Sequence, residues 1–573
     1  MLICILAIVI YANSLNYPFI LDDEILVVKN YLIRSWRFIP QIFQTDLTLS
    51  VSKEANFYRP LQAISYLLDY QIWQLDVFGY HFTNILLFII NGVLVYFLIH
   101  ILSRDAILAT LSALFFLTHP IYCEAVTYIA GRADILVAIF SISSLILFIQ
   151  YSNSKDNKKY VLYLGSLIGF GLALLSKELA LMLPLILILH DLSFKSDVFL
   201  RFDKFIRRYF CFIAITVAYI ALRLTLLRFS EVSGATASFS LYKRLLIFLA
   251  NFNLYFGILV FPFGLHISRT FLIPWNFVNL YVICGVVSLS LILSASFFYY
   301  IKNRQIFFWV WWFIIWLIPQ SGIFPINSFF AEHFIYLSAI GFFVIAVSIL
   351  NKFLRGKSFL YLSIITIMFF SYGTILHNRD WASGEIFYKT IIKYNPKSWL
   401  AHIRIGHVYF DQGFYNKAEN EYLTALRIYP GFASAHANLA YVYINLGQPE
   451  RAIIEIGKNL GIDNILSSKG KRKFPSKKEY LKVVRKDGGL VNIYNELGML
   501  FSKHKLFDYA RLAFEQAIRF APEYPDVHWN LGSLYWQMGN YKEAQKEWEL
   551  VLKIDPSNAY VRAWLAKINP QKP

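Results

Sequence analysis

The chain has 573 residues, of which 57% are hydrophobic and 18% are Phe, Trp or Tyr, and its formal net charge is +18. Repeated apolar runs close to twenty residues long exclude an ordinary soluble protein. The positive charge does not predict nucleic-acid binding, because many Lys and Arg residues lie in short loops between apolar runs, where membrane proteins concentrate them on the cytoplasmic side. The four cysteines all lie in or beside the apolar part, so the rest of the chain has neither a disulfide framework nor a zinc motif.

Apolar runs that end near Leu376 predict a bundle of membrane-spanning helices. We interpret the N-terminal run as a retained first span, because no basic region precedes it and no small-residue cleavage site follows it. The long segment 22–82 comes next, and its amphipathic spacing predicts helices that lie flat on the membrane surface. We expect about eleven spans by the length criterion, near 2–20, 83–103, 105–119, 132–151, 160–175, 179–194, 206–227, 277–300, 305–319, 332–351 and 358–377.

Basic loops determine the expected topology. They lie at 154–159, 201–208, 302–304 and 351–357. All four fall on the cytoplasmic side only if the apolar stretch 243–262 does not cross, so we expect that stretch to be re-entrant or to lie in the interface. The odd number of spans then places the C-terminal part and the acidic pair Asp22 and Asp23 on the extracytoplasmic side.

The C-terminal part repeats itself with a period of 34 residues. Small residues, alanines and prolines recur at this distance, in the pairs Gly406 and Ala440, Gly498 and Gly532, Ala418 and Ala452, Ala510 and Ala544, Pro396 and Pro430, and Pro522 and Pro556. This spacing predicts tetratricopeptide repeats, in which small residues let paired helices approach and the proline ends the second helix. Ala440 and Gly498 are 58 residues apart, which indicates a basic insertion near 461–490. We therefore expect two domains, 1–378 and 379–573.

Ionisable residues gather on the expected outer face of the membrane part. Each has an ordinary explanation, such as a solvated acid beside a span or an arginine that reaches the headgroups. Together they predict a polar site at the outer interface, because charged groups at membrane level are costly and are candidates for function. They are Asp22, Asp23, Arg59, His119, Glu124, Arg132, Lys177, Glu178, Glu332 and His333.

Six motifs in order along the chain, followed by the repeats, carry a family likeness. They are "FILDDEILVVKN", "FYRPLQAISYLLDY", "GYHFTNILLF", "HPIYCEAVTYIAGRADIL", "SKELALMLPLILILHDL" and "AEHFIYLSAIGF". The chain resembles the transmembrane-and-tetratricopeptide O-mannosyltransferases and their bacterial relatives, which belong to the GT-C superfamily. The resemblance implies an all-α fold, with a polytopic GT-C-type membrane domain followed by an α-solenoid.

The resemblance also implies roles for residues. It makes Asp22 and Asp23 the catalytic motif and Arg59 and Arg132 contacts for the lipid phosphate of a polyprenyl-phosphate sugar. The sequence departs from the family at His333, where an arginine is usual, so a titratable cation replaces a permanent one. We expect no cofactor and no metal, because the lipid-linked sugar is itself the substrate.

The expected chemistry explains these residue types. A Ser or Thr hydroxyl attacks poorly until a base takes its proton, and one positioned carboxylate suffices. We assign that role to Asp22, with Asp23 positioning it or the acceptor. The leaving phosphate needs cations rather than an acid, and Arg59, Arg132 and Lys177 are the candidates. In-line attack would invert the anomeric centre.

Other functions stay open at this point. The protein could be a non-catalytic membrane-anchored scaffold for envelope proteins, a ligase or polymerase of lipid-linked glycans, or a transporter. The preferred hypothesis is a membrane glycosyltransferase that moves a sugar, with mannose preferred, to Ser or Thr of extracytoplasmic proteins held by the repeats. Its partners would be the lipid donor, a protein or peptide acceptor and membrane lipid, with no nucleic acid. We expect a bacterial inner membrane, or otherwise the endoplasmic reticulum membrane.

Overall fold

The computed structural model of the chain falls into two compact units, Met1–Asn395 and Pro396–Pro573. All regular elements in the described residues are helical, which confirms the all-α prediction. The basic insertion lies almost wholly outside the described residues, and the expected domain boundary at 378 stays a prediction. The described residues are 2–48, 57–195, 202–227, 239–266, 274, 276–323, 328, 330–354, 356–448, 451–452, 454–455, 489–503 and 505–568.

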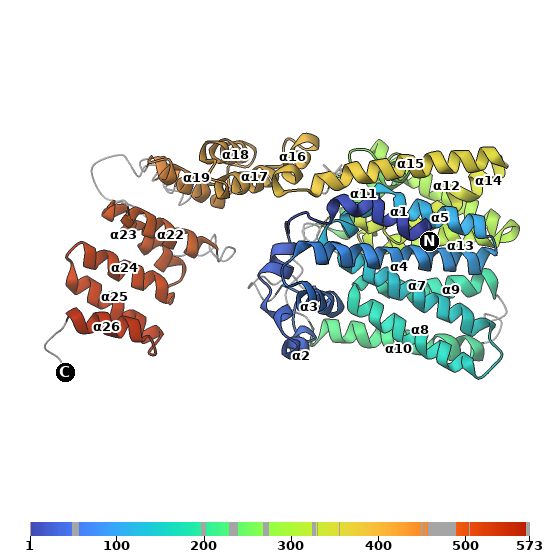
Figure 1. Ribbon diagram of the computed structural model, residues 1–573, viewed down its shortest axis with the longest axis horizontal. Helices are drawn as coiled ribbons and strands as arrows, with labels where there is room; N and C mark the ends of the chain where they lie inside the picture. Colours follow the sequence, from blue (N-terminus) through green and yellow to red (C-terminus); the bar gives the residue numbers. More distant parts are fainter. Residues whose placement is uncertain are drawn as a thin grey trace. The chain divides into compact units, whose positions relative to one another are not determined.

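The first unit is a bundle of long apolar helices that run side by side (Figure 1). Helices α2 (Ile39–Ile42), α3 (Pro60–Trp73), α6 (Cys123–Val126) and α16 (Gly384–Tyr394) accompany them. The bundle helices are α1 (Leu2–Tyr11), α4 (Val77–Ser103), α5 (Ala106–Thr118), α7 (Arg132–Asn153), α8 (Lys158–Ser176), α9 (Leu183–Phe194), α10 (Phe202–Leu224), α11 (Leu241–Val260), α12 (Leu280–Lys302), α13 (Arg304–Leu317), α14 (Ser338–Phe353) and α15 (Lys357–Asn378).

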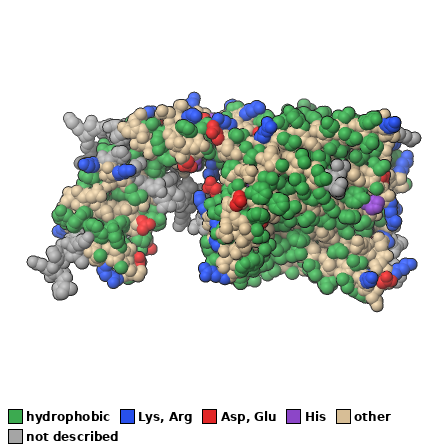
Figure 2. All heavy atoms as spheres, in the orientation of Figure 1, with side chains coloured by type: hydrophobic (Ala, Val, Ile, Leu, Met, Phe, Trp, Pro, Cys, Tyr) green, Lys and Arg blue, Asp and Glu red, His purple; other side chains and the backbone are tan. Residues whose placement is uncertain are grey.

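Seven helices in the described residues are long and apolar enough to cross a membrane, or eight if the bent pair formed by α5 and the segment 120–126 counts as one span. A broad hydrophobic surface covers this unit, and Lys and Arg side chains gather toward its ends (Figure 2). The protein is therefore a multi-pass membrane protein. The other expected spans correspond to shorter helices, α1, α9, α13 and α14, so the count of eleven crossings stays a prediction.

The polar residues predicted from the sequence lie at one end of this bundle, which we call the site end. Side-chain contacts define it. Arg132 at the start of α7 reaches the backbone of Tyr80 at the start of α4, and Lys177 after the end of α8 reaches Asp134. At the opposite end, the start of α13 meets the end of α4, where Gln305 donates to the Leu102 carbonyl.

Helix α11 contains the stretch that we expected not to cross. Its length and composition would allow a crossing. Its contacts favour a helix that does not cross, because both of its ends meet the same end of the bundle. A Cβ at Gly322, beyond the end of α13, would touch Arg244 at the start of α11, whereas the Leu259 carbonyl near the end of α11 lies 3.2 Å from His119 Nε2 at the end of α5. The helix thus runs across the site end, and its position relative to a membrane stays a prediction.

The second unit consists of paired antiparallel helices with the predicted repeat spacing. Close approach explains its glycines: a Cβ at Gly406 would lie 2.5 Å from the Tyr422 ring, and one at Gly532 would lie 2.4 Å from Trp548 Nε1. The helices are α17 (Trp399–Asp411), α18 (Tyr415–Ile428), α19 (Ala433–Asn445), α22 (Gly489–Lys503), α23 (Phe507–Phe520), α24 (Pro525–Gln537), α25 (Tyr541–Ile554) and α26 (Ala559–Ile568).

Candidate functional site

The acidic pair lies in a tight turn at the site end, and its two members face different environments. Leu21 has φ of 55°, and a π-helical turn, Glu24–Val28, follows the pair. Asp23 is 1% exposed, and its carboxyl group accepts hydrogen bonds from the backbone N–H groups of Ile20 (3.2 Å) and Ala130 (2.8 Å). Asp22 is exposed. Burial raises the pKa of Asp23 to about 8, against the opposing effect of these two hydrogen bonds.

The exposed member of the pair is held through its backbone. The N–H of Asp22 donates to the Tyr128 hydroxyl at 3.1 Å, and the Tyr128 ring stacks on Trp381, with ring centroids 5.2 Å apart. Among the described residues, the Asp22 carboxylate forms no side-chain hydrogen bond or ion pair. The loop therefore fixes where this carboxylate stands and leaves it accessible to a substrate.

Arg132, predicted to contact the donor phosphate, is instead enclosed by protein. Its side chain is 0% exposed and forms an ion pair with Asp69 at 2.6 Å, and burial raises the pKa of that carboxyl while the guanidinium opposes the shift. The guanidinium also donates to the Asn84 side chain at 2.6 Å, to the Ser65 hydroxyl at 3.2 Å and to the Tyr80 carbonyl at 3.1 Å. These contacts make Arg132 a link between α3, α4 and α7, and its role as a phosphate contact stays a prediction.

The other two predicted cations differ in how firmly they are paired. Lys177 Nζ lies 2.6 Å from Asp134 Oδ1, and burial lowers the pKa of its ammonium while Asp134 opposes the shift. Arg59, at the start of α3, makes a looser pair with Glu178 at 3.5 Å, and its guanidinium lies over the Phe57 ring. Arg59 is accordingly the more available cation for an anionic ligand.

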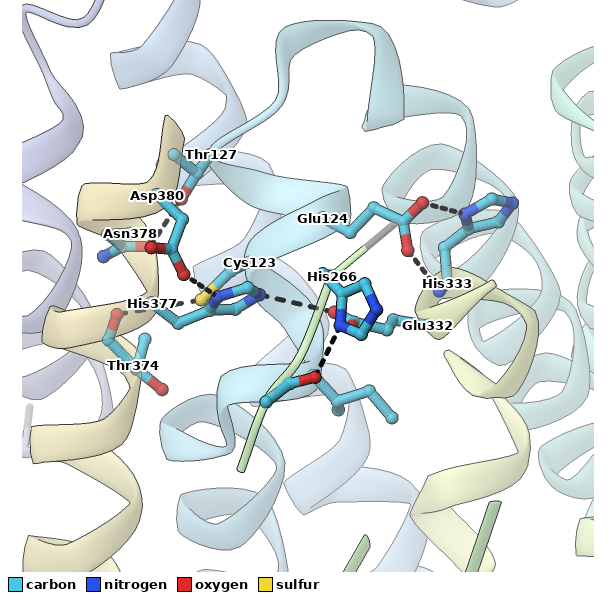
Figure 3. Close-up of polar contacts among 12 residues, drawn as sticks. Cys123, Glu124, Thr127, His266, Glu332, His333, Thr374, His377, Asn378 and Asp380 are labelled. Atoms are coloured by element: carbon cyan, nitrogen blue, oxygen red, sulfur yellow. Dashed lines mark hydrogen bonds and ion pairs between the residues drawn. The ribbon is translucent and has the colours of Figure 1, made fainter. Parts of the chain in front are cut away.

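Glu124 and His333, from different segments, form a close pair. Glu124 is buried. One of its carboxylate oxygens lies 2.8 Å from His333 Nδ1, and the other accepts the His333 backbone N–H at 3.0 Å (Figure 3). This double contact fixes the imidazole ring in one orientation. His333 is partly exposed, so its position at the end of the bundle is set by a buried carboxylate while part of the ring faces outward.

A second histidine, His377 at the end of α15, lies between two carboxylates. Its Nδ1 is 2.8 Å from Asp380 and its Nε2 is 3.4 Å from Glu332, the residue before His333 (Figure 3). Thr390 of α16 donates to the other Asp380 oxygen at 3.2 Å. These contacts connect α16 with the loop that carries His333.

The remaining predicted residue, His119, has a structural role. It is fully buried, packs against the Phe343 and Phe370 rings, and its Nδ1 accepts the backbone N–H of Ile121. This histidine shapes the turn after α5 and links it to α11. It does not reach a surface where a substrate could bind.

The structure brings the predicted residues together at one end and adds partners that the sequence analysis missed. These are Asp69, Asn84, Asp134, His377 and Asp380. The sequence could have indicated the ionisable partners among these residues, because acids and histidines within or beside apolar runs are rare and nearly always paired. Periodicity alone could not tell which acid meets which base.

Two comparisons with known proteins agree with this organisation. Residues 55–233 match the family "Dolichyl-phosphate-mannose-protein mannosyltransferase", and residues 406–447, 433–464 and 504–568 match tetratricopeptide repeat families. Part of the membrane unit is thus similar to a mannosyltransferase family, and the C-terminal unit is similar to tetratricopeptide repeats.

Named relatives are similar to this protein along most of the chain. The protein is 26% identical to Protein O-mannosyl-transferase F38B6.6 of Caenorhabditis elegans, over 74% of this chain and 62% of that protein. It is 21% identical to Protein O-mannosyl-transferase TMTC3 of Homo sapiens, over 96% of this chain and 63% of that protein. Its homologues are therefore protein O-mannosyl-transferases, which confirms the resemblance seen in the motifs, and the chain spans less than two thirds of their length.

Proposed function

We propose that this protein is a membrane mannosyltransferase that moves mannose from a polyprenyl-phosphate donor to Ser or Thr side chains of proteins. The observation that carries the proposal is the acidic pair: an exposed carboxylate, Asp22, stands beside a buried carboxyl group, Asp23, at the end of the bundle where cations also lie. The relatives named as protein O-mannosyl-transferases support the same reaction class.

The proposed reaction assigns different tasks to the two acids. The Asp22 carboxylate takes the proton from the acceptor hydroxyl as the hydroxyl oxygen attacks the anomeric carbon. The bond between that carbon and the phosphate oxygen breaks, the electron pair leaves with polyprenyl phosphate, and the anomeric configuration inverts. Asp23, with a pKa of about 8, is mainly neutral at pH 7, so it adds little charge beside Asp22 while it holds the turn in place.

The leaving phosphate is stabilised by cations rather than by a proton donor. Arg59 is the first candidate, because its ion pair with Glu178 is the longest among the predicted cations. Lys177 contributes at longer range through its charge, since its ammonium is held by Asp134. The proposal includes no cofactor and no metal, because each step uses groups of this chain and of its two substrates.

The repeats supply the acceptor side of the proposal. Tetratricopeptide solenoids present an extended concave surface, which suits a peptide better than a small molecule. We place both the active site and the repeats on the extracytoplasmic side, in a bacterial inner membrane or otherwise in the endoplasmic reticulum membrane. The basic loops of the sequence support this orientation.

Mass spectrometry of extracytoplasmic proteins from cells with and without the gene tests the proposal. The expected result is hexose on Ser or Thr residues that disappears in the deletion strain and returns with the wild-type gene. Loss of a lipid-linked glycan product with unchanged protein glycosylation would favour a glycan ligase instead. Unchanged glycosylation together with misassembled envelope proteins would favour a scaffold.

A further inference from the structure

Helix α16 is the last helix of the first unit, and one of its faces packs on the site end of the bundle. Four of its residues follow the i, i+3, i+4, i+7 pattern of a single helix face. They are Phe387, Thr390, Ile391 and Tyr394. Phe387 and Ile391 are buried, and the Tyr394 ring stacks on His266, with ring centroids 4.8 Å apart. Two sets of contacts lead from this face to the predicted site residues.

The first set of contacts is a row of aromatic rings that ends at the acidic pair. The Phe387 ring lies 5.0 Å from the Trp381 ring, measured between centroids, and the Tyr128 ring stacks on Trp381 at 5.2 Å. Trp381 is buried, so its ring is enclosed by its neighbours. The Tyr128 hydroxyl accepts the Asp22 backbone N–H at 3.1 Å. The position of the proposed base therefore depends on α16 through Trp381 and Tyr128.

The second set of contacts is a row of polar groups that ends at the turn carrying His333. The Thr390 hydroxyl donates to one Asp380 oxygen at 3.2 Å, and the other Asp380 oxygen lies 2.8 Å from His377 Nδ1. His377 Nε2 lies 3.4 Å from Glu332 (Figure 3). Both His377 and Glu332 are buried. Because Glu332 precedes His333 directly in the chain, this row helps to place the His333 imidazole.

The two rows begin one helical turn apart, at Phe387 and Thr390, and this common origin matters for a reaction. Reacting groups must be held in place closely, since a displacement of about 1 Å can cost about 100-fold in rate. Asp22 lies in a turn and His333 in a short 3₁₀-helical segment, Glu332–Ile335, and such segments are held by the side chains that pack on them. One helix that supports both can fix their relative position.

From these contacts we propose that α16 is a positioning element of the active site, acting through Trp381 on Asp22 and through His377 on His333. The inference rests on the proposed function and adds Trp381 and His377 to it as positioning residues, because each is buried and acts on the site through a neighbour. The Asp22 carboxylate must reach the acceptor hydroxyl, and the stacked rings hold the backbone from which it extends. The competing explanation is that α16 only stabilises the fold.

Mannose transfer by the full-length protein, from mannosyl polyprenyl phosphate to an acceptor peptide, tests the aromatic row. Trp381→Leu removes the stacked ring but keeps an apolar side chain, whereas Trp381→Phe keeps a ring. We expect kcat to fall about 10- to 100-fold in Trp381→Leu, with unchanged affinity for polyprenyl monophosphate, and Trp381→Phe to recover most of the rate. Ile386→Ala, which shortens an exposed side chain of α16, is the matched control and should transfer at the wild-type rate.

A double variant separates positioning from a general loss of stability. Tyr128→Phe removes the hydroxyl that accepts the Asp22 N–H, so it should lower kcat by a factor similar to that of Trp381→Leu. If Trp381 acts through this hydroxyl, adding Trp381→Leu to Tyr128→Phe should lower kcat by less than about twofold more. Losses that multiply in the double variant would overturn the proposal, because the ring and the hydroxyl would then act separately.

Thr390→Val tests the polar row with a change of nearly equal volume. It removes the donor to Asp380, and we expect kcat to fall about 3- to 10-fold, as for the loss of one hydrogen bond. His377→Gln, which cannot reach both carboxylates as the ring does, should lower kcat at least as much. The matched control is Thr424→Val, the same change at a threonine whose hydroxyl donates to the Asn420 carbonyl of its own helix. This control should keep the wild-type kcat.

Melting temperatures and binding of polyprenyl monophosphate, measured on the same preparations, decide between positioning and folding. Losses of melting temperature, lipid binding and kcat in the same proportion would show that α16 only stabilises the fold and would overturn the proposal. If Trp381→Leu does not fold, Tyr128→Phe and Thr390→Val carry the test, and wild-type kcat in both would overturn it. Wild-type kcat in those variants with transfer lost in Asp22→Asn would refute this inference alone, whereas normal transfer by Asp22→Asn would refute the proposed base.

Discussion

The carboxyl group of Asp23 and the backbone N–H of Ala130 are joined by a 2.8 Å hydrogen bond between residues 107 positions apart in the chain. The Ala130 carbonyl in turn accepts from the Gln62 side chain at 2.8 Å, in the first turn of α3. The turn of the acidic pair, the loop before α7 and the start of α3 are thereby held as one piece. Arg59 caps the start of α3, so this arrangement also fixes the proposed phosphate contact relative to the acids.

Asp23 should make folding stability depend on pH. Its pKa rises from an ordinary value of 3.8 to about 8 in the folded protein, so between about pH 4 and pH 8 the folded state holds a proton that the unfolded chain has released. Stability is therefore highest at the acidic side of this window and falls as pH rises through it. In Asp23→Asn, which cannot ionise, melting temperatures measured in detergent from pH 5 to 9 should fall less. Glu24→Gln, which changes an exposed acid of the same turn, is the control and should keep the wild-type slope; parallel curves for all three proteins would contradict the assignment.

The buried ion pair between Arg132 and Asp69 should matter for stability rather than for donor binding. Removing one partner leaves the other charge buried and unpaired, which typically costs about 3–5 kcal/mol. Arg132→Ala should therefore lower the melting temperature and the yield of folded protein. Arg59→Ala, which removes a partly exposed arginine with a longer ion pair, should change stability much less. A stable Arg132→Ala protein with weakened polyprenyl-phosphate binding would support the phosphate role instead.

The contact between Glu124 and His333 should affect transfer through the orientation of the imidazole ring. Glu124→Gln keeps the shape and one acceptor oxygen but removes the charge, and we expect the rate of transfer to fall about tenfold, as for a charge-assisted hydrogen bond. The guanidinium in His333→Arg can donate N–H groups to the Glu124 carboxylate, so this variant should retain more activity than His333→Ala. Initial rates of mannose transfer, compared with melting temperatures of the same proteins, would check this. Equal rates in His333→Arg and His333→Ala would exclude a role for the contact.

The repeats contain a recurring pair of a histidine on the first helix and a glutamate on the second. His402 lies 2.6 Å from Glu421, and His528 lies 2.6 Å from Glu547. The hydrogen bond to the carboxylate raises the pKa of each histidine. This stabilisation is complete below the ordinary histidine pKa of about 6.5 and is lost as pH rises through the raised value.

The same pairs should make protection of the repeats from proteolysis pH-dependent. Cleavage of the full-length protein within the repeats should become faster between pH 6 and pH 8, after correction for the pH dependence of the protease itself. Glu547→Gln should flatten this dependence in its own repeat, because the amide cannot favour the charged imidazole. The exposed Glu549→Gln on the same helix is the control. An unchanged pH profile in Glu547→Gln would show that the pair does not contribute.

Much of the architecture could be predicted from the sequence, because helices and repeats produce regular patterns of apolar residues, small residues and prolines. The 34-residue spacing of small residues and prolines identified the repeats, and the apolar runs located the long helices. Helix α4 nevertheless begins at Val77, before the apolar run expected at 83, because Asp76 caps it with a hydrogen bond to the N–H of Phe78. Polar first turns of this kind do not show in hydropathy.

The site could be predicted only in part, because pairings depend on the positions of helices in space. The motifs pointed to Asp22 and Arg59, but they could not show that Asp69 would form an ion pair with Arg132.

Mannose transfer by purified Asp22→Asn protein tests the central claim most directly. The assay uses mannosyl polyprenyl phosphate and an acceptor peptide, with binding of polyprenyl monophosphate measured on the same preparation. A positioned base contributes about 10²–10⁴-fold to rate, so transfer should fall by that factor while lipid binding remains at the wild-type level. Transfer by Asp22→Asn at the wild-type rate would contradict the account.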